Sequence, residues 1–279
     1  MVSWPELGTR VTVRYRRPAG SVPPLTDAVG HLLAVHPVVR VRTKTGAVVE
    51  CSPADVVALR VLTDAPVRAS AIRALEHAAA AACPGAEHTW LDGWLLRAGR
   101  DAALCANSAV PLDISASPAT IPAIADWYER RGLTSWLAFP DRLLRPPPGL
   151  TAEHTERVSV CDVSSVTPAL RPDASVTLEQ RSAESWLMFG VHAGGAEARA
   201  AVTDAPDGTR WVGLSSIRAA DEQAAAALCR ALLAWGADGG ATRAYMGVDD
   251  ADATTLTDAL GFRLHHRRRY VPARRIDTV

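Results

Sequence analysis

The chain has 279 residues, of which 48% are hydrophobic, and its 30 basic and 30 acidic side chains give a formal net charge of zero. This length allows two or three packed domains, and the balanced charge disfavours a polyanion partner, so no nucleic acid is expected. The chain shows no apolar signal core and no run near the roughly 20 apolar residues of a membrane span. We therefore expect a soluble, cytoplasmic protein without a membrane partner.

The cysteines and histidines favour neither a disulfide framework nor a metal site. The five cysteines are odd in number, scattered and never in C-x-x-C spacing, which predicts reduced thiols. The eight histidines lack metal-ligand spacing. His265 and His266 are neighbours on a predicted strand, where side chains point to opposite faces. Two interpretations of these positions stay open, a packed histidine and a general base.

Residues 1–63 are predicted to form a small SH3-like β-barrel. Thr9–Tyr15 alternates apolar and polar residues, Val38–Thr43 and Val48–Cys51 flank a glycine-containing turn, and Val56–Leu62 supplies a last strand. Such a unit is either a docking module, with a protein as the candidate partner, or a structural cap on the next domain, because a fold alone does not define function.

Residues 64–150 are predicted to form a first α/β half. Pro66–Cys83 is alanine-rich with one apolar face, and Pro66 suits the first helical position. The proline-rich stretch Leu144–Leu150 is the clearest linker of the chain. The other predicted elements are strands at Gly93–Ala98, Ala103–Val110 and Thr134–Phe139, with a turn between the first two, and a helix at Ile121–Arg131.

Residues 151–279 are predicted to form a second α/β half around a strand, a turn and a helix. In the helix Ala224–Gly236, Leu228, Leu232 and Trp235 lie at i, i+4 and i+7, and the glycines at and after position 236 are typical of a helix end. The other predicted elements are strands at Thr155–Val163, Ser175–Glu179, Glu197–Thr203, Trp211–Ile217, Ala244–Val248 and His265–Val271, and a helix at Ser182–Gly190. Both halves place a helix between strands after a hairpin, which suggests a duplication.

Four stretches of the second half, WVGLSSIRA, ALCRALLAWGADGGATRAYMGV, TTLTDALGF and HHRRRYV, resemble the GNAT superfamily of acyl-CoA-dependent N-acyltransferases over roughly residues 155–272. The first half, with GWLLRAGRDAALCANSAVPLD and IADWYERRGL, is similar to the degenerate first half of some actinobacterial members, which also carry a small β-domain in front. The resemblance implies an α/β protein with an SH3-like barrel and two GNAT-like halves. It also implies acetyl transfer from acetyl-CoA to a small-molecule or protein amine that the sequence does not identify.

In this family the acyl-CoA donor lies along the strand that precedes the helix. Backbone groups of this strand bind the pantetheine arm of the donor and the oxyanion. The resemblance therefore implies a set of donor-binding positions and assigns no catalytic residue. The implied positions are Leu214, Ser216, Ile217, Arg218, Ala219, Ala224, Ala225, Ala226, Asp250 and Thr257.

The chain departs from the family at its phosphate loop. The family pattern R/Q-x-x-G-x-G/A has glycines that let backbone N–H groups close on the pyrophosphate, whereas Asp221–Ala227 contains none. The carboxylates of Asp221 and Glu222 would repel a phosphate about 4 Å away by about 1 to 4 kcal/mol, depending on the dielectric. Both acids suit the first turn of a helix instead.

Two further positions bear on catalysis. Asp250 stands where many members have Asn, and Thr257 stands where many have the Tyr that protonates the departing thiolate, a role for which a Thr hydroxyl is too weak an acid. Tyr245 and Tyr270 lie on predicted strands and are expected to be packed there. Two functions stay open: an N-acetyltransferase, and a catalytically inactive GNAT-like binding or regulatory protein.

Overall fold

The computed structural model divides the chain into two compact units, Met1–Pro66 and Val67–Val279. Strands from both predicted halves of the second unit lie in one sheet. The predicted domain boundary between these halves, at residue 150, stays a prediction. The residues that the structure describes are 4–5, 7–43, 45–62, 67–99, 103–166, 173–180, 187–249 and 255–273.

The first unit is a five-stranded antiparallel sheet in the order β4-β3-β2-β1-β5. The alternation in β1 buries Val11 and Val13 against Leu32 and Val41, as the sequence pattern predicts. The sequence reading missed β2, where a glycine and an aspartate interrupt the apolar pattern. The strands are β1 (Arg10–Arg16), β2 (Leu25–Ala34), β3 (Val39–Thr43), β4 (Val48–Cys51) and β5 (Val56–Val61), with a 3₁₀ turn at Pro53–Asp55.

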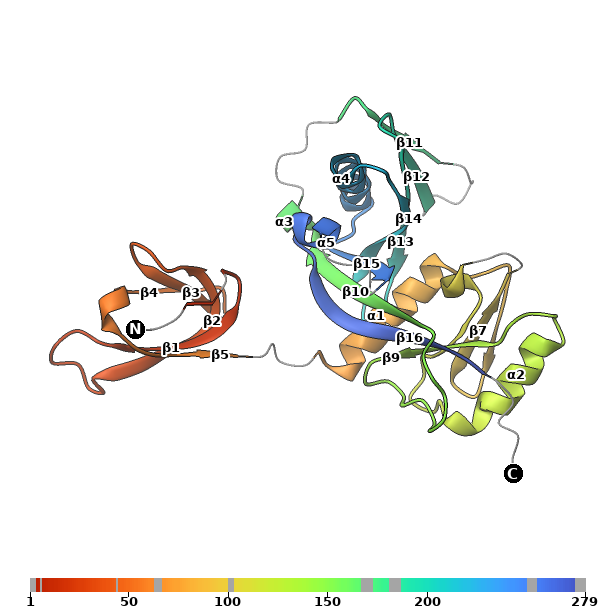
Figure 1. Cartoon of the computed structure of the whole chain (residues 1–279), viewed down its shortest axis with the longest axis horizontal. Coiled ribbons are helices and arrows are strands. Elements are labelled where there is room, and N and C mark those ends of the chain that lie inside the picture. Colours follow the sequence, from red (N-terminus) through yellow and green to blue (C-terminus); the bar gives the residue numbers. More distant parts are fainter. Residues whose placement is uncertain are drawn as a thin grey trace. The chain divides into compact units, whose positions relative to one another are not determined.

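The second unit is built on one mixed sheet of eleven strands, in the order β11-β12-β13-β14-β15-β10-β16-β9-β8-β7-β6 (Figure 1). β16 pairs antiparallel with β10 on one side and with β9 on the other, so it joins the two predicted halves. The strands are β6 (Glu87–Leu91), β7 (Trp94–Ala98), β8 (Ala109–Pro111), β9 (Trp136–Pro140), β10 (His154–Asp162), β11 (Val176–Glu179), β12 (Leu187–His192), β13 (Ala196–Asp204), β14 (Arg210–Arg218), β15 (Arg243–Asp249) and β16 (Arg263–Pro272).

Helices α1 and α4 cover opposite faces of this sheet. Alternation along β14 sends Val212 and Leu214 into the core under α4, while Trp211 packs with Tyr245 under α1. α1 therefore belongs to the first predicted half but packs on strands of the second. The helices are α1 (Ala69–Ala82), α2 (Ile121–Glu129), α3 (Val163–Val166), α4 (Glu222–Asp238) and α5 (Thr255–Ala259), with 3₁₀ turns at Leu104–Ala106 and Pro118–Thr120.

Two predicted elements are wrong. The predicted helix Ser182–Gly190 is instead the strand β12 over its described part, because a short apolar run does not distinguish strand from helix. Gly190 lets α4 approach, since a Cβ there would lie 2.6 Å from a methyl of Leu228.

The predicted hairpin between Gly93–Ala98 and Ala103–Val110 is also different. β7 forms its tight hairpin with the preceding strand β6, across Asp92 and Gly93, which both have positive φ. Only Ala109–Pro111 of the later stretch is a strand, and it pairs with the other edge of β7.

Two helix ends also differ from their predictions. α1 begins at Ala69 rather than at Pro66, which lies outside the described residues. α4 continues through Gly236 to Asp238 and ends at Gly239, and Gly240 then takes a positive φ of 82°. Gly236 is a packing position, because a Cβ there would lie 2.6 Å from Val212.

The prediction that all thiols are reduced is wrong for one pair. Cys83 ends α1 and Cys105 lies in the 3₁₀ turn after β7, and the two form a disulfide with a Cα–Cα distance of 6.0 Å. The hairpin β6–β7 folds the chain back between them, which the spacing in sequence does not show. Cys51, Cys161 and Cys229 are free thiols.

No helix in the described part of the chain has both the length and the apolar character needed to cross a membrane.

Candidate functional site

The neighbouring parallel strands β14 and β15 separate part-way along their length. They pair from Trp211 with Arg243 to Leu214 with Met246 and no further. Beyond that point β14 stays with β13 as far as Arg218, and β15 stays with β10 to its end. Among the described residues, the edge of β14 past Leu214 therefore has no strand partner on the β15 side. We call this place the β14–β15 opening.

A bulge in β14 shapes the rim of this opening. Arg199 of β13 pairs with Ser215 and Glu197 pairs with Arg218, so two residues of β14, Ser216 and Ile217, stand against one of β13. Ser216 has φ = 52°, in the left-handed region that non-glycine residues rarely adopt. The bulge lies just where β14 leaves β15, and there the β14 backbone changes direction. Backbone groups at this place are available to a ligand whichever side chains are present.

The first turn of α4 follows the opening, and an aspartate caps it. The Asp221 carboxylate accepts hydrogen bonds from the N–H groups of Gln223 and Ala224, each at 3.1 Å. The N–H of Ala225 bonds the Asp221 carbonyl at 3.1 Å. The prediction that Asp221 suits a helix start is thereby confirmed.

The sequence-predicted donor positions fall into three groups. Leu214 is buried under α4, while Ser216 to Ala219 line the exposed end of β14 beside the opening. Ala224, Ala225 and Ala226 are buried in α4, whose first turn packs against the core. Thr257 is buried on α5, and Asp250 lies outside the described residues. The roles given to these residues stay predictions.

A carboxylate that the sequence reading missed lies at the mouth of the opening. Glu156 is on β10 opposite Asp249, and a Cβ added to Gly247 would lie 3.6 Å from Glu156 Oε2. Gly247 directly follows Met246, where the pairing with β14 stops. The side chain of Glu156 is 26% exposed.

Neighbouring side chains hold Glu156 in place. Arg268 donates from Nη1 to Glu156 Oε2 at 2.7 Å, and the Tyr270 hydroxyl donates to the same oxygen at 3.1 Å. Both partners are buried on β16. A carboxylate oriented by two fixed donors is pre-organised for a cationic ligand such as an ammonium group.

Behind Glu156 lies a buried acid on α1. The Glu76 carboxylate accepts from Arg268 Nη2 at 2.7 Å and from His266 Nε2 at 2.6 Å. Burial alone would raise the pKa of Glu76, but the charge of Arg268 and the bond from His266 outweigh it and lower the pKa to about 2. The sequence signal for this buried acid was the position of Glu76 on the apolar face of the predicted helix, four residues after Ile72.

The histidine pair is part of the same cluster. His265 Nδ1 and His266 Nδ1 are 2.8 Å apart, contrary to the prediction that these side chains point to opposite faces. A register shift in the β10–β16 pairing at this point places both rings together. Burial, with the charges of His266 and Arg243, lowers the pKa of His265 to about 4, so His265 is neutral at pH 7.

The two tyrosines are packed, as predicted. Tyr245 packs edge-on against Trp211 and lies over Gly213, where an added Cβ would be 2.2 Å from its ring. Burial raises the pKa of both Tyr245 and Tyr270 well above the usual value for a phenol. Neither phenol is suited to protonate a thiolate at neutral pH.

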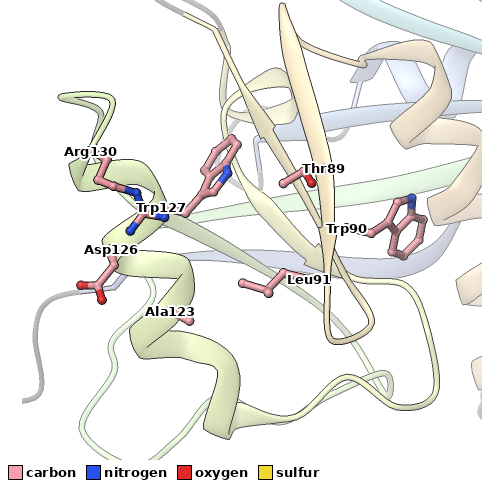
Figure 2. Close-up of a pocket in the computed structure, with 7 residues that line it drawn as sticks. All are labelled: Thr89, Trp90, Leu91, Ala123, Asp126, Trp127 and Arg130. Carbon is pink, nitrogen blue, oxygen red and sulfur yellow. The ribbon is translucent and has the colours of Figure 1, made fainter.

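A separate open pocket of about 280 Å³ lies between α2 and the edge strand β6. Figure 2 shows Trp127 of α2 facing Thr89 and Leu91, while the Trp90 side chain points to the other side of the strand. Arg130, which directly follows α2, also lines the pocket. Ala123 and Asp126 complete the lining. Six strand spacings separate β6 from β15, roughly 30 Å, so this pocket is not part of the β14–β15 opening.

Comparison with known proteins assigns the chain to a family. The model described as "Probable histone acetyltransferase Rv0428c C-terminal" matches residues 69–189 and 187–271. The model described as "Rv0428c N-terminal Sm-like domain" matches residues 5–60. The chain belongs to this acetyltransferase family. The predicted small β-rich domain in front of an acetyltransferase-like α/β unit is confirmed.

One relative spans almost the whole chain. The "Probable histone acetyltransferase Rv0428c" of Mycobacterium tuberculosis (strain ATCC 25618 / H37Rv) is 61% identical over 301 residues, covering 99% of this chain and 98% of the relative. That alignment is longer than the 279 residues of this chain, so some segments of the relative have no counterpart here.

Solved structures of low identity are also similar. A GCN5-related N-acetyltransferase from Kribbella flavida is 14% identical with a TM-score of 0.49, over 74% of this chain and 95% of that chain. A GCN5-related N-acetyltransferase from Sphaerobacter thermophilus is 13% identical with a TM-score of 0.41, over 60% of this chain and 73% of that chain.

The family membership confirms the predicted N-acetyltransferase-like function, without identifying the amine. N-acetyltransferases of this kind use acyl-CoA donors in general. In the described part of the chain, no group of three or more His, Cys, Asp or Glu side chains is arranged to hold a metal ion.

Proposed function

We propose that this chain transfers the acetyl group of acetyl-CoA to a primary amine at the β14–β15 opening. The observation that carries the proposal is the position of the Glu156 carboxylate beside Gly247, where β15 leaves β14. Exposed backbone at the end of β14 is suited to pair with the amide groups of the donor arm and to stabilise the oxyanion. The predicted positions Leu214 to Ala219 are proposed to line this end of the site.

In this proposal Glu156 receives the amine. An amine is an ammonium ion near neutral pH and attacks a thioester only after losing a proton. The carboxylate attracts the cation into the opening and is placed to take that proton. The donor supplies the activated acetyl thioester.

We propose that the amine is a lysine side chain of a basic protein. The relative at 61% identity is named a probable histone acetyltransferase, and a carboxylate at the mouth of the site is complementary to a cationic acceptor. We also propose that the enzyme works in the cytoplasm and that its first unit docks a protein partner.

The alternative, an inactive binding or regulatory protein, is favoured by the cap at Asp221 and by the buried Thr257 and tyrosines. One experiment separates the two. Acetyl-CoA is titrated into the purified full chain by calorimetry, and purified histones incubated with both are analysed by mass spectrometry. Binding followed by acetylated lysines is expected. Neither heat nor acetylation at any donor concentration would favour the inactive protein.

A further inference from the structure

At the helix terminus next to the β14–β15 opening, an aspartate already engages two backbone N–H groups. An α-helix begins with four N–H groups that have no partner within the helix, and a phosphate binds there when these groups are free. In α4 the N–H groups of Gln223 and Ala224 bond the Asp221 carboxylate, and that of Ala225 bonds the Asp221 carbonyl. The bonds to the carboxylate engage two of the four groups, whereas the bond from Ala225 is the first regular hydrogen bond of the helix.

Packing closes the same turn. Ala224, Ala225 and Ala226 are 2%, 4% and 6% exposed, so these side chains face the core, whereas Asp221, Glu222 and Gln223 before them are exposed. The turn between β12 and β13 lies against it, since a Cβ added to Gly194 would be 3.4 Å from the Ala224 methyl. Between Gly213 and Gly236 the sequence has no glycine that would let a diphosphate approach the backbone.

Charge opposes an anion here as well. Asp221 and Glu222 are both exposed at the start of α4. The residues at this terminus therefore do not fit the diphosphate of coenzyme A. The β14–β15 opening, by contrast, offers backbone groups to the thioester arm whichever side chains are present.

Resting on the proposed function, we propose that this chain recognises its donor through the pantetheine thioester and not through the nucleotide diphosphate. A short pantetheine thioester then serves as well as acetyl-CoA. With either donor the amine nitrogen bonds the acetyl carbon and the carbon–sulfur bond breaks. One proton leaves the nitrogen and one proton ends on the released thiol, so the reaction needs no further reactant.

The test compares kcat/KM for acetyl-CoA and S-acetylpantetheine with one acceptor, polylysine, and the full chain. The expected values agree within about threefold, because the nucleotide adds no binding energy in the transition state. A preference for acetyl-CoA of about a hundredfold would overturn the inference and leave the proposed function standing. Turnover with neither donor would overturn both.

A double variant gives a second readout. Asp221→Ser with Glu222→Gln keeps an N-cap side chain and removes both charges. It is expected to raise kcat/KM for acetyl-CoA and to leave that for S-acetylpantetheine unchanged. Asp207→Asn, a charge change in the β13–β14 turn at the other end of β14, is the matched control and should alter neither value.

Direct binding is measured by calorimetry with adenosine 3′-phosphate 5′-diphosphate, the nucleotide portion of the donor. No heat is expected from the unmodified chain and measurable heat from the double variant. Micromolar binding by the unmodified chain would overturn the inference.

Discussion

The guanidinium of Arg268, on β16, bonds the Glu76 carboxylate, on α1, through Nη2 at 2.7 Å, with both side chains buried. The two residues are 192 positions apart. Arg268 also bonds Glu156 at the β14–β15 opening. One buried ion pair therefore anchors α1, from the first predicted half, to β16, whose Arg268 also holds Glu156 of the candidate site.

Replacing Glu76 with Gln should lower the free energy of unfolding by about 3 kcal/mol, because it removes half of the charge that compensates buried Arg268. Chemical denaturation followed by circular dichroism measures the change. Glu87→Gln is the matched control, since its pair with Arg131 is exposed and should matter much less. An equal loss in the two variants would contradict this role for Glu76.

Stability should fall on acidification in two steps. The pKa of His265 is 6.5 when unfolded and about 4 when folded, so between these values the unfolded chain binds an extra proton and stability decreases as pH falls. Glu76 adds a second loss as pH falls from 4.5 towards about 2. His265→Asn should flatten the dependence of the unfolding free energy on pH between 6.5 and 4. Retention of the full slope in the His265 variant would refute the assignment.

Glu156→Gln should lower kcat/KM for the amine acceptor about a hundredfold, the size of effect typical of a lost proton acceptor. The loss should appear in kcat and not in KM alone, because a proton acceptor acts in the chemical step. Glu153→Gln, an exposed neighbour, is the control. Thermal unfolding of each variant establishes that the fold is kept. Full activity in a folded Glu156→Gln variant would exclude the proposed role.

Gly236→Ala should destabilise the second unit by about 1 to 3 kcal/mol through overpacking. Helix propensity alone predicts the opposite sign, because alanine favours a helix over glycine. Destabilisation is expected because the added Cβ would lie 2.6 Å from Val212. In a Val212→Ala background the loss should become smaller, and denaturation of the four proteins in this double-mutant cycle measures the coupling.

Local sequence signals predicted much of the fold. β1 follows from period-two alternation, and β4, β10 and β14 follow from short strand-like runs. Asp221 was predicted to suit the first turn of a helix and is the N-cap of α4. β12 was assigned wrongly because its apolar run is short and its pairing partners lie elsewhere in the chain. Tertiary context decides such segments.

The candidate site was only partly accessible from sequence. The resemblance identified the end of β14 and the altered phosphate loop, because both are contiguous stretches. Glu156, Glu76 and Arg268 come together from β10, α1 and β16, and no local pattern reports a contact across 192 positions. The Cys83–Cys105 pair was missed for the same reason, since it depends on how β6 and β7 fold back.

The central position of β16 has a consequence for biosynthesis. β9 and β10 leave the ribosome well before β16, yet each needs β16 as its neighbour. Until residues 263–272 emerge, both strands expose an unpaired edge, and Glu76 has no Arg268 beside it. The nascent chain thus carries two unfinished sheet fragments for most of its synthesis, and a single late strand fuses them. We therefore expect stalled or truncated translation products that lack β16 to aggregate more readily than the full chain.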